Sequence, residues 1–195
     1  MNSWIETIID NKIELLKKIK DIGFIEELVN IGYVMERSIS GGNKIMLAGN
    51  GGSAADAQHF SAELIGRFTG IERPALASIA LGTEVTTLTS IANDYDYNSV
   101  FTRQIQGIGK GGDVLVVIST SGNSSNLVNA VKKAALMGIT TVGLLGKDGG
   151  ELKKLCDYSL VVPIDMTPRI QEIHTLCIHI LCEMIEKDLF QEKEE

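Results

Sequence analysis

The chain has too few cysteines to build a disulfide scaffold. Its 195 residues include only three, Cys156, Cys177 and Cys182, and none of them forms a C-x-x-C pair. Because their number is odd, they cannot all be paired within one chain, and this usage fits a reducing compartment. The sequence therefore predicts buried structural thiols and a cytoplasmic location.

A long apolar run and an excess of positive charge are also missing. No hydrophobic stretch approaches the roughly 20 residues of a membrane span, and the first six residues, MNSWIE, lack the basic and apolar regions of a leader. The formal net charge is -7 and the pI is about 5.0. Nucleic acids and anionic membranes both require a basic surface. We expect an unprocessed protein that binds neither.

Apolar residues are abundant enough for one core. The composition is 44% hydrophobic and 22% charged, and 195 residues suit a single domain. Apolar side chains recur at helical spacing over residues 4–19 and again over about 25–39, just before Gly41 and Gly42. This pattern predicts two N-terminal helices that form a helical hairpin.

Five short apolar runs follow, and each predicts a strand. They cover residues 44–48, 75–81, 113–118, 140–145 and 158–162. Their near-continuous hydrophobicity, with helical segments between them, favours a parallel sheet covered on both faces. A last helix is predicted from Thr167 and Pro168 to about Leu189, since threonine can cap its first turn and proline suits the first helical position. The fold class is therefore α/β, a three-layer doubly wound five-stranded parallel sheet, with ligands at the carboxyl ends of the strands.

Two loops rich in glycine and serine lie between an apolar run and a helical segment. The first is GNGGS at residues 49–53, and the second is STSGNS at residues 119–124. Such loops direct backbone N–H groups and hydroxyls at an anion, and the following helix adds its partially positive N-terminus. Ser53 and Asp56 also fit a capping box, so the first loop can serve as a turn and cap. Four of the six residues in the second loop carry hydroxyls, which favours a small phosphorylated ligand.

The first loop also satisfies a dinucleotide-binding pattern. Gly49, Gly51 and Ala54 match G-x-G-x-x-G/A. An NAD site further requires an acidic residue after the second strand, whereas Glu72 precedes the run 75–81. The pattern alone is therefore a weak indication of NAD.

Taken together, four segments resemble the phosphoheptose isomerases, which are sugar isomerase (SIS) proteins. The segments are GNGGSAADAQHFSAEL at 49–64, ANDY at 92–95, STSGNS at 119–124 and RIQEIH at 169–174. The resemblance covers nearly the whole chain. It implies one SIS domain of flavodoxin-like topology over residues 1–195, with oligomerisation helices in 1–40 and an α/β core with a C-terminal helix in 41–195. It also implies a homotetramer with active sites at subunit interfaces, which converts sedoheptulose 7-phosphate to D-glycero-D-manno-heptose 7-phosphate for lipopolysaccharide or capsule.

The chemistry of this family indicates which side chains react. His59 and Glu63 are four residues apart on a predicted helix, about 40° of rotation and 6 Å of rise, so they can face one site. The resemblance implies a Zn²⁺ ion held by His59, Glu63, Gln171 and His179, with Glu63 as the base and His179 as the acid. It further implies substrate contacts from Asn50, Gly51, Gly52, Glu63, Asn93, Asp94, Ser119, Thr120, Ser121, Ser124 and Gln171. His174 falls on a different helix face and is interpreted as structural or as a residue that supports the site from behind its ligands. Asp94 has the alternative of a turn residue.

A rival function comes from the pair Ala54-Ala55. Many similar isomerases carry a bulkier or polar pair there, whereas SIS proteins that bind the replication initiator have the two alanines. Those adaptors lack an acid and a base at the positions of Glu63 and His179, and this chain has both. An isomerase is therefore the leading prediction, with a sugar-phosphate-binding adaptor as the alternative.

Overall fold

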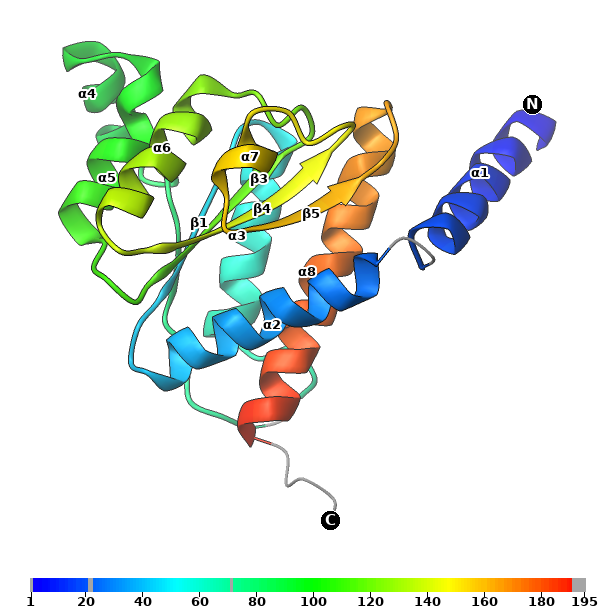
Figure 1. Cartoon of the computed structure of the whole chain (residues 1–195), viewed down its shortest axis with the longest axis horizontal. Helices are drawn as coiled ribbons and strands as arrows, with labels where there is room; N and C mark the ends of the chain where they lie inside the picture. Colours follow the sequence, from blue (N-terminus) through cyan, green and yellow to red (C-terminus); the bar gives the residue numbers. More distant parts are fainter. Residues whose placement is uncertain (1, 21–22, 71, 191–195) are drawn as a thin grey trace.

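The computed structural model describes residues 2–20, 23–70 and 72–190. Its elements follow the α/β order predicted from the sequence (Figure 1). They are α1 (Asn2–Lys20), α2 (Phe24–Ser40), β1 (Ile45–Gly49), α3 (Gly52–Ile65), β2 (Ser78–Ala80), α4 (Val85–Asp94), the 3₁₀ turn η1 (Tyr97–Ser99), α5 (Val100–Ile108), β3 (Val114–Ser119), α6 (Ser125–Leu136), β4 (Thr140–Gly146), α7 (Leu152–Leu155), β5 (Tyr158–Val162) and α8 (Thr167–Phe190).

The five strands form one parallel sheet in the order β2-β1-β3-β4-β5, which confirms the predicted fold class. After β1 the chain first adds β2 on one side and then returns to add β3 on the other. The strand order therefore reverses between β1 and β3, and in such sheets this is where ligands bind.

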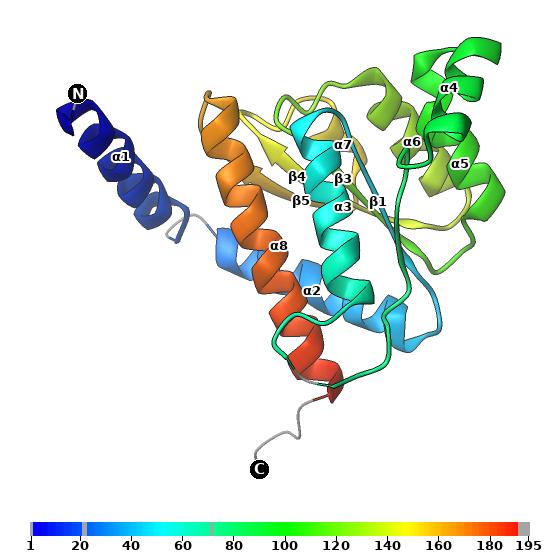
Figure 2. The same ribbon diagram turned by 180° about the vertical axis from the view of Figure 1, so that it is seen from behind.

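Alternating side chains divide the core into two layers. Ile45 and Leu47 of β1 pack under α2, α3 and α8, whereas Met46 and Ala48 point to the opposite layer under α5 and α6. Figures 1 and 2 show these helix groups on opposite faces of the sheet. Because both faces are covered, β1 and β3 are buried along their whole length, as their apolar runs predict.

The edge strand β2 is shorter than predicted. Only Ser78–Ala80 pair with β1, whereas the apolar run covers 75–81. The backbone N–H of Leu76 donates instead to the carbonyl of Leu64 at the end of α3 (3.1 Å), so this part of the run binds a helix rather than a strand.

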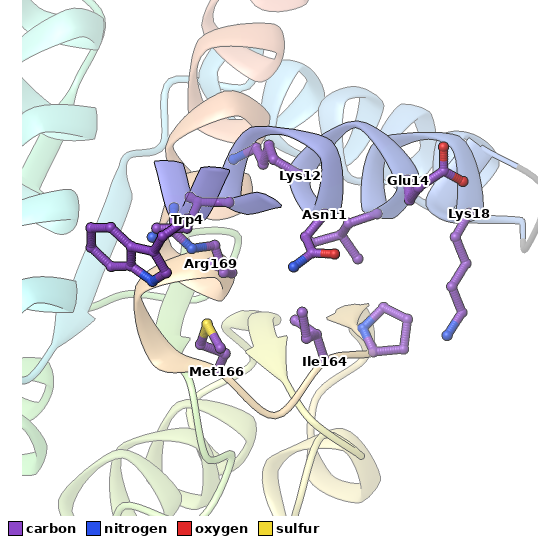
Figure 3. Close-up of a pocket in the computed structure, with 11 residues that line it drawn as sticks. Trp4, Asn11, Lys12, Glu14, Lys18, Ile164, Met166 and Arg169 are labelled. Carbon is purple, nitrogen blue, oxygen red and sulfur yellow. The ribbon is translucent and has the colours of Figure 1, made fainter. Parts of the chain in front are cut away.

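The N-terminal helix α1 leans away from the body of the molecule in Figures 1 and 2. An ion pair of 3.0 Å between Lys12 and Glu172 connects it to α8. A cavity of about 490 Å³ lies between α1 and residues 163–169, the segment that leads into α8 (Figure 3). Trp4 and Ile9 of α1 remain 67% and 55% exposed. Although it carries apolar side chains, neither this helix nor another in the described ranges is long and apolar enough to cross a bilayer.

Candidate active site

The two glycine- and serine-rich loops start side by side at the carboxyl edge of the sheet. Gly49, the last residue of β1, is paired with Ile118 of β3. The loops are then joined by their side chains, because the amides of Asn50 and Asn126 exchange hydrogen bonds of 3.0 and 2.9 Å. The Tyr97 hydroxyl also donates to Asn50 (3.0 Å), which connects the segment after α4 to the same point.

Glycine is required where these loops turn. A Cβ at Gly49 would overlap the backbone carbonyl of Ser53, so the chain can enter α3 this tightly only without a side chain. Gly122 has a φ of +67°, and a Cβ there would overlap the carbonyl of Gly149. Both positions are therefore fixed by backbone geometry.

The loop after β3 presents hydroxyl groups whose protons are free to donate. Ser119 accepts a bond from the N–H of Gly122 (3.1 Å), and Ser121 accepts one from Asn123 (3.3 Å). A hydroxyl that accepts one bond still has its proton for a ligand. Ser124 stands at the N-cap of α6, where its side chain makes no capping bond. Together with the helix N-terminus, these groups can hold a phosphate without a cationic side chain.

Helices α3 and α8 run side by side in the same direction (Figure 2). Three side-chain contacts connect them at successive levels, and we call these contacts the rungs of a ladder. At the first rung, the end of the Gln171 side chain lies against Gly52. At the second, the Thr175 hydroxyl donates to Asp56 (3.2 Å). At the third, the Nε2 atoms of His59 and His179 are 3.4 Å apart. Residues 119 or 120 positions apart in the chain thus meet along the two helices.

The third rung assembles the predicted acid and base. His59 Nε2 lies 3.1 Å from a carboxylate oxygen of Glu63, as their spacing on one helix predicts. The His179 ring contacts the His59 ring edge-on, with centroids 5.0 Å apart, and Phe68 packs on His179 at 5.3 Å. Glu63 and His179 therefore both contact His59, in a partly exposed part of the interface between α3 and α8.

Gln171 does not share this rung. It lies eight residues before His179, about 12 Å along the helix, and contacts Gly52. Within the described ranges, no group of three or more His, Cys, Asp and Glu side chains is arranged as a metal site. The structure thus brings together His59, Glu63 and His179, and it places Gln171 nearer to the loop after β1.

Comparisons with known proteins agree with the fold and identify the family. The SIS domain family model matches residues 9–146. The phosphoheptose isomerase of Clostridium acetobutylicum is 50% identical over 194 residues, which cover 99% of this chain and 98% of that protein. The chain belongs to the phosphoheptose isomerases. The solved phosphoheptose isomerases from Neisseria gonorrhoeae and Francisella tularensis superpose with TM-scores of 0.89 and 0.86, at 39% and 35% identity. These matches cover 95% of this chain in both cases, and 98% and 96% of the respective solved chains.

Two residues predicted to contact the substrate lie outside the ladder in this member of the phosphoheptose isomerase family. Asn93 and Asp94 are exposed at the end of α4 and are hydrogen-bonded to each other (2.9 Å). Asp94 lines a shallow pocket with Arg103 and Gln104, on the α4–α5 side of the molecule. The contacts of the described residues therefore do not bring this pair to the two loops.

Two ionisable groups, one on α3 and one on α8, have shifted pKa values because of burial. Burial raises the pKa of Asp56, against the hydrogen bond from Thr175 and the nearby His59. Burial also lowers the pKa of His174 to about 4, although its bond to the Leu145 carbonyl (3.0 Å) acts in the opposite direction. His174 is fully buried in the core, which supports a structural role.

The acidic residue that follows β2 is Glu84, which the sequence interpretation overlooked. Its carboxylate accepts bonds from the backbone N–H groups of Thr86 and Thr87 and so caps α4. This carboxylate is engaged in the helix cap, so it gives no support to a dinucleotide site.

Some residues that shape the site were missed at the sequence level. Asn126 is the second residue after the loop 119–124, so its place in the first turn of α6 could have indicated a role in that loop. Phe68 lies in the segment after α3 and carries no local signal. Its contact with His179 depends on the pairing of α3 with α8, which no local pattern contains.

Proposed function

We propose that this chain converts sedoheptulose 7-phosphate to D-glycero-D-manno-heptose 7-phosphate, the first step of nucleotide-activated heptose biosynthesis. The observation that carries the proposal is the third rung, where His59 joins the base Glu63 to the acid His179. Full-length identity of 50% to phosphoheptose isomerases supports the same substrate.

The reaction moves a proton between neighbouring carbons, so it requires one base and one acid. Glu63 removes a proton from C1 of the ketose, and the electron pair forms the C1=C2 bond while His179 gives a proton to O2. The resulting enediol then loses its O1 proton to His179, and Glu63 returns a proton to C2. Atoms and charge balance, and each group recovers its starting state.

The hydroxyl loop supplies the phosphate contacts in this proposal. Thr120, Ser121 and Ser124 are half-buried, whereas Ser119 is buried beneath them. Since these donors are neutral, they bind the phosphate without the tight ion pairs that would slow product release. Asn50, Gly51 and Gly52 then lie next to the sugar, with Gln171 beside Gly52.

The nitrogen and oxygen donors of the third rung are of the kinds that Zn²⁺ binds, which supports the proposal of a zinc ion there. In a tetrahedral zinc site with bonds of 2.0–2.1 Å, neighbouring ligand atoms are about 3.4 Å apart, and the Nε2 atoms of His59 and His179 have that separation. Without a cation, His59 Nε2 faces both a carboxylate oxygen and a second ring nitrogen, and one proton cannot serve both. His59, Glu63 and His179 would hold the ion, and Gln171, about 12 Å away along α8, would complete the ligand set from a neighbouring subunit of the proposed oligomer. Bound zinc would polarise the carbonyl oxygen of the substrate.

A homotetramer with active sites at subunit interfaces is also part of the proposal. Four apolar residues on α1 are 44–67% exposed, more than a monomeric surface usually groups together. They are Trp4, Ile5, Ile9 and Ile13. The three cysteines are free thiols, which supports a reducing cytoplasm as the location.

Conversion of sedoheptulose 7-phosphate to the aldose, followed by NMR, tests this function with Glu63→Gln as the decisive variant. Loss of a general base costs about 10²–10⁴-fold in rate, so we expect a folded oligomer with kcat reduced by at least 100-fold. Glu183→Gln is the matched control, because it neutralises a half-exposed carboxylate of α8 that pairs with Lys187. A chelator should lower the rate of the parent protein and leave the Glu63→Gln rate unchanged.

Near-normal turnover by Glu63→Gln would refute the assigned base. A folded parent protein that binds the sugar phosphate but produces no aldose, with or without added zinc, would favour the adaptor function.

A further inference from the structure

A buried ion pair lies directly behind the proposed acid and base. Arg73 and Glu186 are 2.6 Å apart, and both side chains are only 1% exposed. Arg73 lies after α3, and Glu186 is two turns beyond His179 on α8. Breaking such a pair leaves an uncompensated buried charge, whereas its formation alone adds little stability. Because the ion pair itself adds little stability, its importance lies in the backbone and side chains that it holds in position.

On the α8 side, the pair holds the segment that carries Phe68. The Glu186 carboxylate accepts bonds from the backbone N–H groups of Phe68 (2.7 Å) and Thr69 (2.8 Å) and from the Thr69 hydroxyl (2.6 Å). Burial opposes ionisation of Glu186, but these bonds and Arg73 outweigh it and lower the pKa to about 2. The segment is thereby fixed so that the Phe68 ring packs on His179, tilted by 31°.

On the α3 side, the same pair holds the end of the helix that carries Glu63. The Arg73 guanidinium donates to the backbone carbonyl of Glu63 (3.0 Å) and to that of Leu64 (2.9 Å). The last turn of a helix leaves its carbonyls without intrahelical partners, and a cation there is favourable. Arg73 thus fixes the backbone from which the Glu63 side chain extends.

We propose that Arg73, Glu186 and Phe68 are positioning residues, which set the relative orientation of Glu63 and His179. The inference rests on the proposed function of these two groups. One ion pair contacts both groups. Arg73 donates to the backbone carbonyl of Glu63, and Glu186 holds the Phe68 segment, whose ring packs on His179. Misplacement of a reacting group by about 1 Å can cost about 100-fold in rate, so these remote contacts act on turnover rather than on substrate affinity.

The test compares Phe68→Leu and Glu186→Gln with Asp113→Asn in the full-length protein. Phe68→Leu keeps an apolar side chain and removes the ring, and Phe68 is only half-buried. Asp113 is the matched control, because its fully buried carboxylate pairs with Lys44 (2.6 Å) and accepts backbone bonds at the opposite, amino edge of the sheet. Melting curves, kcat and KM are measured for each variant. The ring-proton NMR signals of His179 are recorded as well, assigned by comparison with His179→Ala.

We expect kcat to fall at least tenfold in Phe68→Leu and Glu186→Gln, with KM within twofold of the parent protein. Asp113→Asn should lower the melting temperature but leave kcat within twofold. The His179 ring signals should move in Phe68→Leu and Glu186→Gln and stay in place in Asp113→Asn. Should Glu186→Gln fail to fold, Phe68→Leu decides alone.

Unchanged kcat and unchanged His179 signals in Phe68→Leu would overturn the inference. If the parent protein turns over substrate and Glu63→Gln does not, the proposed function stands even when the inference about Phe68 fails. If the parent protein lacks turnover, the proposed function fails, and the NMR signals alone still decide whether Phe68 orients the His179 ring. An equal fall of kcat in Asp113→Asn would also overturn the inference, since general destabilisation would then explain all variants.

Discussion

Substitution of Gly52 by alanine should separate activity from stability. Gly52 is the first residue of α3, and its φ lies outside the left-handed region. An added Cβ would overlap the amide nitrogen of Gln171 and lie 3.2 Å from its Cδ. These atoms are the far end of a flexible side chain, so Gln171 can move away while the backbone stays. The substitution therefore displaces one proposed substrate contact.

The expected changes in stability and in rate follow from these contacts. Alanine is favoured over glycine by up to about 1 kcal/mol within a helix, and 1 kcal/mol corresponds to about 2–4 °C in a chain of this size. We expect Gly52→Ala to melt within about 4 °C of the parent protein. A neutral hydrogen bond contributes about 0.5–1.5 kcal/mol, so losing the Gln171 contact should lower kcat/KM by about two- to twelvefold.

A double-mutant cycle with Gln171→Ala tests whether the effect passes through Gln171. Once Gln171 is truncated, Gly52→Ala should cause no further fall in kcat/KM. Gly49→Ala is the contrast, because its Cβ would overlap backbone atoms of Ser53, which cannot move aside. It should destabilise the protein by about 3 kcal/mol or more. If Gly52→Ala lowers kcat/KM equally in both backgrounds, the steric explanation is wrong.

Two further predictions concern stability. Burial lowers the pKa of His174 to about 4, whereas an unfolded histidine has a pKa near 6.5. Between about pH 6.5 and 4 the unfolded state therefore binds a proton that the folded state does not bind. The unfolding free energy should fall by about 3 kcal/mol between pH 6.5 and 4, and His174→Gln should remove most of this slope in urea titrations. Asn126→Ala leaves the Asn50 amide without its reciprocal partner, so we expect a loss of about 1–3 kcal/mol, and an unchanged melting curve would show that the amide pair is replaced by water.

Most of the fold could be predicted because its signals are local. The apolar runs of β1, β3, β4 and β5 are nearly continuous, and each lies within a residue or two of the observed strand. The run at 75–81 was the exception. Its apolar character satisfied the strand pattern, and Ser78–Ala80 do form β2. The N–H of Leu76, however, donates to the end of α3, so the beginning of the run lies outside the sheet, and this contact exists only in the folded arrangement.

The candidate site was only partly predictable. The spacing of His59 and Glu63 indicates a shared helix face, and their contact agrees with it. Gln171 and His179, eight residues apart, gave no indication of the α3 residue that each one contacts, because this depends on the relative register of two distant helices. Glu186 was equally hidden, since its neighbours Glu183 and Lys187 form an exposed ion pair typical of a solvated helix surface.

The ladder between α3 and α8 restricts how the lengths of these helices can change during evolution. The three rungs join residues separated in sequence by 119, 119 and 120 positions: Gly52 with Gln171, Asp56 with Thr175, and His59 with His179. A deletion of one residue between Gly52 and His59 would rotate every later α3 side chain by about 100° and shift it by about 1.5 Å. His59 would then leave His179 while Gly52 still met Gln171. Insertions and deletions should therefore be tolerated in the connections around these helices, whereas inside them the number of residues is as constrained as the identity of the reacting side chains.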